Sequence, residues 1–180
     1  MLTLTKIQTN HSLYNFVEGL LHQSFPVDER RDDDVQRYNT DHNPAFNCYL
    51  ITDEEGENET AIGLITVWEL NGFRYVEHLA TSPKVRNKGY GKRIMETLKD
   101  EFPGTIILEV ERPEDEMSIR RIEFYKRCGF SLCLQDYIQP PYRKGGNNLP
   151  LYLMFSGTSS IDEQYPEIRD EIYRKVYDVK

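Results

Sequence analysis

The segment "KVRNKGYGKR" (residues 84–93) holds five basic residues and no acidic one, whereas the 180-residue chain has a formal net charge of −8. A strand-like run precedes this segment and a helical pattern follows it at once. The first turn of a helix has backbone N–H groups without internal partners, at the positive end of the helix dipole. Gly89 and Gly91 let the backbone approach an anion without a Cβ in the way. The segment therefore predicts a phosphate-binding loop, although a solvated basic turn would have the same composition.

Two common nucleotide-binding motifs do not fit this loop. A P-loop requires Gly-Lys followed by Ser or Thr, but Gly91 and Lys92 are followed by Arg93. The four-residue spacing between the two glycines of a P-loop is also missing. A dinucleotide fingerprint needs another glycine pattern. Neither the P-loop nor the dinucleotide fingerprint therefore describes this loop.

The composition limits the class of protein. A chain with 38% hydrophobic and 12% aromatic residues is globular, and its length suits one domain. No apolar run is long enough to span a membrane and the first residues do not resemble a secretory signal, so we expect a cytoplasmic protein without a membrane partner. The negative charge argues against nucleic-acid binding. The three cysteines are irregularly spaced and the four histidines show no ligand spacing, which predicts free thiols and no metal site.

The residues before the loop alternate between strand and helix patterns. "LTLTKIQ" predicts an opening strand, and Thr9 or Asn10 could cap a helix with apolar positions between residues 13 and 21. "DERRDDDVQRY" predicts a second short helix that is mostly solvated. Three strand-like runs follow, over residues 46–53, 60–70 and 73–81. Asn71-Gly72 between the last two is a strong signal for a two-residue hairpin turn.

The residues after the loop complete an α/β pattern. A helix that Pro103-Gly104 ends is followed by the apolar run 105–111, which predicts a strand buried on both faces and parallel to 73–81. The remaining segments predict a helix over 117–128 that Gly129 ends, two strands over 130–138 and 149–155, and an amphipathic helix within 161–180. We therefore expect a domain over residues 1–156 and a helical extension over 157–180 that packs on this domain or on a dimer partner.

Two stretches resemble motifs of one enzyme family. "HLATSPKVRNKGYGKRIM" is similar to the motif of the GNAT (GCN5-related) N-acetyltransferases in which Arg or Gln, two residues, Gly, one residue, and Gly or Ala follow each other. "RRIEFYKRCGF" resembles the family's helix that ends in Phe-Tyr, a spacer with lysine, and Gly-Phe. The resemblance implies a mixed six- or seven-stranded sheet with two splayed parallel strands and helices on both faces. It also implies a cytoplasmic transferase that uses acetyl-CoA as co-substrate and no metal.

The resemblance assigns the coenzyme to the loop and to the strand before it. The loop backbone and Lys92 would hold the pyrophosphate, and the backbone of the strand would run antiparallel to the pantetheine arm. The residues implied are Leu79, Ala80, Thr81, Arg86, Asn87, Lys88, Gly89, Tyr90, Gly91 and Lys92.

Three carboxylates are candidates for taking the proton of the substrate amine. The favoured base is Glu77, on the strand before the loop, although it could instead pair with a neighbouring cation. Glu109 and Glu111 share one face of the parallel strand. They could bind a cationic substrate or assist Glu77, or they could pair with Arg112 or Arg121. Strand alternation turns His78 away from the face of Glu77, which favours a core histidine.

Tyr125 matches the tyrosine with which the family commonly protonates the departing thiolate of CoA, although it could also be a packed aromatic residue. The chain departs from the family pattern near this tyrosine. Ser118 and Arg121 stand where the family usually has Asn and Ala, so the coenzyme contact expected of Ser118 rests on its hydroxyl alone. A backbone N–H of residues 77–81 would polarise the thioester carbonyl.

The substrate is not identified by the sequence. Segments 25–45 and 136–149 would cover the substrate side, and they supply Glu29, Arg30, Tyr137 and Tyr142 as candidate contacts. We expect an amine of a small molecule or a peptide, and a monomer or a homodimer. A non-catalytic module that binds or senses acyl-CoA on the same fold is the alternative, and it would need neither Tyr125 nor a base.

Overall fold

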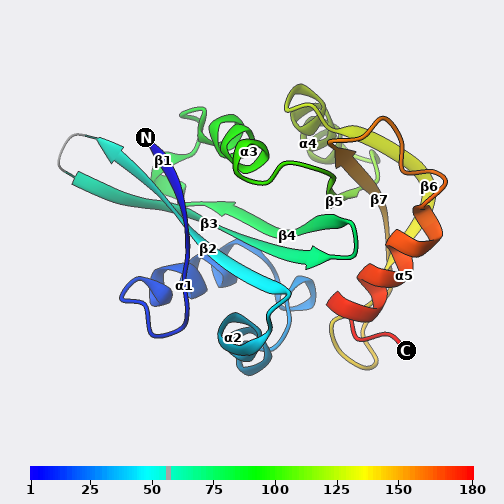
Figure 1. Cartoon of the computed structure of the whole chain (residues 1–180), viewed down its shortest axis with the longest axis horizontal. Helices are drawn as coiled ribbons and strands as arrows, with labels where there is room; N and C mark the ends of the chain where they lie inside the picture. Colours follow the sequence, from blue (N-terminus) through cyan, green and yellow to red (C-terminus); the bar gives the residue numbers. More distant parts are fainter. Residues whose placement is uncertain (56–57) are drawn as a thin grey trace. The chain divides into compact units, whose positions relative to one another are not determined.

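The structure, a computed structural model, describes residues 1–55 and 58–180. In these ranges it contains seven strands and five α-helices, which Figure 1 labels in chain order. The elements are β1 (Leu2–Lys6), α1 (Tyr14–Ser24), α2 (Asp33–His42), β2 (Phe46–Glu55), β3 (Asn58–Leu70), β4 (Phe73–Thr81), α3 (Tyr90–Glu101), β5 (Ile106–Glu111), α4 (Glu116–Arg127), β6 (Ser131–Gln139), β7 (Leu149–Ser156) and α5 (Tyr165–Val176). Two short 3₁₀ helices cover Val27–Glu29 and Pro83–Val85.

The strands hydrogen-bond in the order β1-β2-β3-β4-β5-β7-β6, which is the mixed seven-stranded sheet that the sequence predicted. The chain forms two compact units. The first contains Met1–Glu69 and Glu77–Phe102, and the second contains Leu70–Val76 and Pro103–Lys180. β4 contributes residues to both units. The division into residues 1–156 and 157–180 stays a prediction.

The first unit is built on antiparallel strands. β1 pairs with β2, and β2 pairs with β3, with a register shift between Ile51 and Thr52. Within this unit α3 lies on one side of the strands, and α1 and α2 lie on the other (Figure 1). The apolar face predicted for the helix after the basic loop is buried, since Ile94, Met95 and Leu98 are at most 1% exposed.

The expected cap of the first helix is wrong. Leu13 occupies the N-cap position of α1, and no side chain caps this helix end. Thr9 is used elsewhere, because its hydroxyl donates to Asp41 Oδ2 at 2.5 Å and its backbone N–H donates to Asp41 Oδ1 at 2.8 Å. The local capping signal was therefore overridden by a contact with a residue 32 positions away.

The second unit confirms the predicted parallel strands. β4 pairs with β5 in parallel through Arg74–Val76 and Ile106–Leu108. β7 pairs with β5 and with β6, antiparallel in both cases, so the last strand lies between two earlier ones. Ile106, Ile107 and Leu108 are at most 3% exposed, as expected for a strand buried on both faces.

The predicted turn residues have the backbone conformation that glycine favours. Gly72 in the hairpin between β3 and β4 has φ +84°, and Gly129 after α4 has φ +86°. The three cysteines are free and buried, as the sequence predicted.

The C-terminal helix α5 packs on its own chain. Its apolar stripe is buried, with Tyr165, Ile168, Ile172 and Val176 between 0% and 7% exposed. Two of its tyrosine hydroxyls donate to backbone carbonyls of β6: Tyr165 to Asp136, at 2.7 Å, and Tyr173 to Ile138. Because a helix of this length is marginal alone in water, this packing stabilises it. No helix in residues 1–55 or 58–180 combines the length and the apolar character needed to cross a bilayer.

Candidate functional site

The basic loop has the backbone of an anion-binding turn. Asn87 has φ +63° and Gly89, the N-cap residue of α3, has φ +77°. Successive backbone N–H groups in such conformations form concave sites for anions. A Cβ built on Gly89 would meet no atom within 4 Å, so the space beside this backbone is open. The predicted phosphate cradle at the start of α3 is therefore physically suitable for a pyrophosphate.

The basic side chains of the loop divide into two groups. Arg93 is tied down, because its guanidinium donates to Asp53 Oδ2 at 3.1 Å, and Tyr90 donates to the same oxygen at 2.8 Å. Burial alone would raise the pKa of Asp53, but the hydrogen bonds from Tyr90, the N-terminal amine and Arg93 outweigh burial and bring the pKa to about 2. Arg86 and Lys88 are exposed and form no ion pair in the described part of the chain. These two charges are available to an anionic ligand.

The strand before the loop alternates in burial. Ala80 is buried, whereas Leu79 and Thr81 on either side of it are partly exposed. The recorded pairing of β4 with β5 ends at Val76, before these residues are reached. Both observations fit the resemblance, which assigns this backbone to the pantetheine arm.

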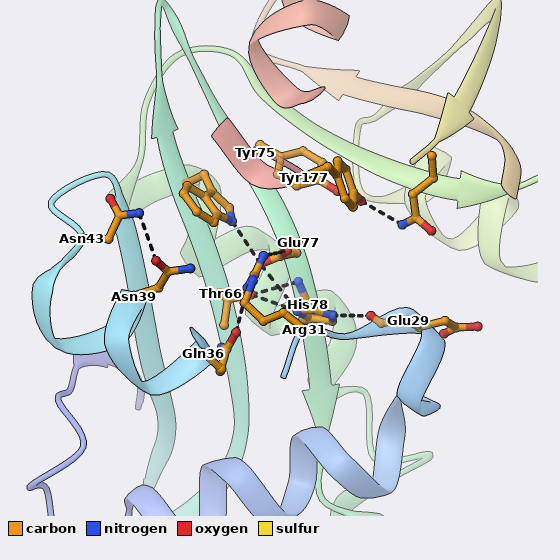
Figure 2. Close-up of polar contacts among 12 residues, drawn as sticks. Glu29, Arg31, Gln36, Asn39, Asn43, Thr66, Tyr75, Glu77, His78 and Tyr177 are labelled. Atoms are coloured by element: carbon orange, nitrogen blue, oxygen red, sulfur yellow. Dashed lines mark hydrogen bonds and ion pairs between the residues drawn. The ribbon is translucent and has the colours of Figure 1, made fainter. Parts of the chain in front are cut away.

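Glu77 is held in a buried ion pair (Figure 2). The Arg31 guanidinium donates to both carboxylate oxygens, with Nη1 at 3.0 Å from Oε2, and Trp68 Nε1 donates to Oε2 at 3.0 Å. The side chains of Arg31 and Glu77 are 5% and 0% exposed. Arg31 also donates to Gln36, at 2.7 Å, and lies over the Trp68 ring. This geometry matches the alternative interpretation of Glu77, a carboxylate paired with a cation.

The ion pair makes Glu77 a weak base. Burial raises the pKa of the carboxyl, but the charge and hydrogen bonds of Arg31, together with His78 and the hydrogen bond from Trp68, outweigh burial, so the pKa lies below its ordinary value. A carboxylate whose two oxygens already accept charged hydrogen bonds has little tendency to take another proton. The structure therefore favours a positioning role for Glu77 over the predicted role as base.

His78 is a core histidine, as predicted. It is 2% exposed, its Nε2 lies 2.9 Å from the carbonyl of Glu29, and its ring packs edge-on against Phe25. Its Nδ1 nevertheless lies 3.7 Å from Glu77 Oε2, closer than strand alternation suggested. Burial lowers the pKa of His78, which favours the neutral ring.

Glu109 lies in a cluster of neutral donors in the second unit. Its carboxylate accepts hydrogen bonds from the hydroxyls of Tyr137 and Tyr177, the latter at 2.9 and 3.0 Å, and from Gln139 Nε2 at 2.7 Å. Tyr75 donates as well. No cation pairs with Glu109 in the described part of the chain. This carboxylate is therefore stabilised by dipoles alone.

The protonation of this cluster follows from its burial. Burial raises the pKa of Glu109, and the hydrogen bonds from the tyrosines and Gln139 oppose that shift only in part. Burial and the nearby carboxylate raise the pKa of Tyr137 and of Tyr177 well above the ordinary value, so both remain donors. Of the three candidate carboxylates, Glu109 has the environment best suited to a base.

Glu111 forms an exposed ion pair. Its carboxylate accepts from Arg121 Nη1 at 3.1 Å, and both side chains are about half exposed. This is the alternative that the sequence left open, and exposed pairs of this kind contribute little energy.

Tyr125 lies near the end of α4 with its ring packed and its hydroxyl unused. The ring contacts Phe124 and Phe130, at centroid distances of 5.3 and 5.9 Å. The hydroxyl forms no hydrogen bond with any residue in 1–55 or 58–180. Burial raises the pKa of Tyr125, partly opposed by Arg121, so the phenol keeps its proton at neutral pH.

Ser118 caps its own helix, and the coenzyme contact expected of it stays a prediction. It is 1% exposed, its backbone N–H donates to Asp115 Oδ1 at 2.8 Å, and its hydroxyl donates to the Asp115 carbonyl at 2.9 Å. Asp115 and Ser118 form a capping box that satisfies two helix-end donors. The hydroxyl is therefore used inside the protein.

The four candidate substrate contacts have different surroundings. Glu29 is partly buried and accepts from His78 through its backbone, and Arg30 pairs with Asp33 at 3.1 Å. Tyr137 is 0% exposed and lies in β6, within the strand predicted over residues 130–138. Tyr142 lies in the loop after β6 and packs against Tyr177, with a centroid distance of 5.0 Å.

The sequence did not predict the partners of the two buried carboxylates, Glu77 and Glu109. Arg31 lies in a charged stretch whose composition indicates solvent exposure, and nothing in that stretch marks one arginine as buried. Tyr177 continues the three- and four-residue spacing of the C-terminal helix from Tyr173, and this spacing was the one available signal. Tyr75 and Gln139 gave no signal.

Comparisons with known proteins agree on one family. The sequence pattern of the acetyltransferase (GNAT) family matches residues 13–130. A solved structure from Bacteroides thetaiotaomicron, described as an acetyltransferase of the GNAT family, is 42% identical, and the similarity covers 99% of each chain with a TM-score of 0.92. A search of curated proteins finds no match.

More distant structures share the fold. The spermidine N-acetyltransferase of Vibrio cholerae in complex with CoA and spermine is 18% identical, with 86% of this chain and 94% of that chain covered and a TM-score of 0.61. A mutant form of the same enzyme has a TM-score of 0.63 at the same identity, with 86% and 92% covered. The family pattern and the 42% identical structure decide the assignment: the chain belongs to the GNAT family of acetyltransferases.

Proposed function

We propose that this protein transfers the acetyl group of acetyl-CoA directly to a primary amine within a ternary complex. The loop between β4 and α3 supports the binding of the coenzyme. It offers two residues with positive φ, open space beside Gly89 and the unpaired charges of Arg86 and Lys88. These features fit a pyrophosphate, and acetyl-CoA supplies a thioester carbonyl and a thiolate leaving group.

The hydroxyl of Tyr125 is the observation that carries the proposal. This hydroxyl has no partner in the described residues, and it is not one of their buried unsatisfied atoms, since the side chain is only partly buried. It is therefore open to a ligand. Its raised pKa keeps it protonated, so it can donate to a thiolate. A module that only binds acyl-CoA has no use for such a donor.

The chemistry requires one proton acceptor and one donor. The amine nitrogen forms a bond to the acetyl carbon as the carbon–sulfur bond breaks. Glu109 takes the proton that the amine loses, because burial raises its pKa and no cation in the described residues neutralises it. Tyr125 gives its proton to the sulfur. Glu77, paired with Arg31, holds the segment before α2 against β4 instead.

The substrate class is an amine of a small molecule or a peptide. The distant relatives named above act on spermidine, and that likeness extends to the fold alone. Polyamines therefore belong in a test panel together with amino sugars, amino acids and peptide N-termini.

The test is a thiol-release assay with acetyl-CoA and this amine panel. We expect CoA release that depends on one class of amine, with the acetylated amine identified by mass spectrometry. Tight binding of acetyl-CoA without amine-dependent release across the panel would favour the non-catalytic module instead.

Replacing Gly89 by valine should weaken the binding of acetyl-CoA by about tenfold or more, because a β-branched side chain would fill the open space beside the loop backbone and resist φ +77°. Isothermal titration calorimetry measures the dissociation constant directly.

Gly72→Val is the matched control. Gly72 also has a positive φ, +84°, with no atom within 4 Å of its Cβ position, but it lies in the hairpin between β3 and β4. This variant should have the same backbone strain and an unchanged affinity. Equal affinities for the wild type and Gly89→Val, with the fold intact by circular dichroism, would refute the loop assignment.

A further inference from the structure

Tyr177, which follows the C-terminal helix, contacts the buried carboxylate of Glu109 in the second unit. Tyr177 is 7% exposed and comes directly after α5. Its hydroxyl donates to the Glu109 carboxylate, at 2.9 Å from Oε2 and 3.0 Å from Oε1, although the two residues are 68 positions apart. Figure 2 shows Tyr177 beside Tyr75. Their hydroxyl oxygens are 3.3 Å apart.

Several contacts fix Tyr177 in this place. Gln139 Nε2 donates to its hydroxyl at 2.8 Å and to Glu109 Oε2 at 2.7 Å, so that one amide holds both groups. The chain turns sharply after Tyr177, because Asp178 has φ +54° and the N–H of Val179 donates to the Tyr173 carbonyl at 3.0 Å. The hydroxyl is therefore presented in one orientation.

We propose that Tyr177 is a positioning residue for Glu109, so that the C-terminal helix takes part in acetyl transfer rather than only covering the strands. This inference rests on the proposed function of Glu109 as the group that takes the amine proton. A carboxylate with two oxygens can rotate about its last bond, and donors on both oxygens hold it in one plane. Tyr177 contacts both oxygens, whereas Tyr137 contacts only Oε1 and Gln139 only Oε2.

The surroundings of Glu109 make the contribution of one hydroxyl measurable. The groups that face the carboxylate are Tyr75 from β4, Tyr137 and Gln139 from β6, and Tyr177 after α5, with Tyr173 of α5 beside Tyr137. Burial raises the pKa of Tyr137, Tyr173 and Tyr177, so these three phenols stay protonated and neutral. No cation among the described residues pairs with Glu109. The hydrogen bonds from its neutral neighbours therefore oppose the effect of burial on the pKa of Glu109.

The test is Tyr177→Phe. The phenyl ring can still pack against Tyr142, but the donor to Glu109 is lost. A hydrogen bond to the charged form lowers a carboxyl pKa, so its loss should raise the pKa of Glu109. We expect the acidic limb of the kcat/KM profile to move to higher pH by about half a unit to one unit.

A second measurement does not need turnover. Protein labelled with ¹³C at glutamate carboxyls can be titrated by NMR, with the Glu109 signal assigned from its absence in Glu109→Gln. The Glu109 midpoint should shift upward in Tyr177→Phe by the same amount as the kinetic limb. An unchanged midpoint in this titration would overturn the inference.

Tyr165→Phe is the matched control. Tyr165 is on the same helix and donates to the Asp136 carbonyl at 2.7 Å, without contact to Glu109. It should reproduce any general loosening of α5 and leave the Glu109 midpoint where it is. Equal shifts in both variants would reduce Tyr177 to a packing role.

The two proposals can fail separately. An absence of amine-dependent CoA release in the wild type would reject the proposed function, whatever the titration shows. Suppose instead that CoA release is normal and that the Glu109 midpoint shifts in Tyr177→Phe, while the acidic limb of the kcat/KM profile stays where it is. Tyr177 would then position a carboxylate that is not the base, which would also overturn the inference.

Discussion

Replacing Tyr125 by phenylalanine is expected to lower kcat by about 10²- to 10³-fold and to leave the affinity for acetyl-CoA within about twofold. The substitution removes one O–H and keeps the ring that packs on Phe124 and Phe130. Since the hydroxyl has no partner in the described residues, its loss should not destabilise the fold. Steady-state kinetics and calorimetry with acetyl-CoA separate the two effects.

Tyr152→Phe controls for the loss of a phenol in general. Tyr152 is partly buried on β7 and packs under Arg112, at 4.9 Å from guanidinium carbon to ring centroid. This variant should retain the kcat of the wild type. If Tyr125→Phe also turned over at the wild-type rate, Tyr125 would be a packed aromatic residue and the thiolate would take its proton from elsewhere.

The elements of the fold were predictable because their signals are local. The alternation in β1, the Asn71-Gly72 turn and the apolar run of β5 each reflect a periodicity or a backbone preference within about ten residues. The order of the strands was less accessible. β7 enters between β5 and β6 because of pairing between distant segments, and no local pattern encodes that choice.

The candidate site shows the same division. The basic loop was recognisable since its glycines and charges are adjacent in the chain. The environments of Glu77 and Glu109 could not be recognised from the sequence, because their partners Arg31 and Tyr177 are 46 and 68 positions away. Strand alternation predicts which face of the strand a carboxylate occupies. Whether that carboxylate pairs with a cation or accepts from neutral donors depends on residues far away in the sequence. This difference separates a positioning group from a proton acceptor.

Breaking the ion pair of Arg31 and Glu77 is expected to cost about 3–5 kcal/mol of unfolding free energy. In Arg31→Met the Glu77 carboxylate would stay buried without a cation, and in Glu77→Gln the guanidinium would lose its counterion. The double variant removes both charges and should be more stable than the sum of the single losses predicts, by about 1–3 kcal/mol. Urea denaturation of the four proteins completes the double-mutant cycle.

The pH dependence has a definite sign. The pKa of Glu77 in the folded protein lies below its ordinary value of 4.5, so the folded state prefers the ionised carboxylate. The stabilisation is fully present above the unfolded pKa and is lost as the pH falls from about 4.5 through the lower folded pKa. The difference in stability between the wild type and Glu77→Gln should therefore be largest at neutral pH and shrink in acid.

The pair of Arg37 and Glu18 provides the matched control on the surface of the same unit. It has the same two-pronged geometry, with distances of 2.8 and 2.7 Å, but the Arg37 side chain is 51% exposed. Water screens such a pair, so Arg37→Met should cost no more than about 1 kcal/mol. Equal losses at the two pairs would mean that burial does not strengthen the inner pair. The proposed role of Glu77 in holding the segment before α2 would then lose its energetic support.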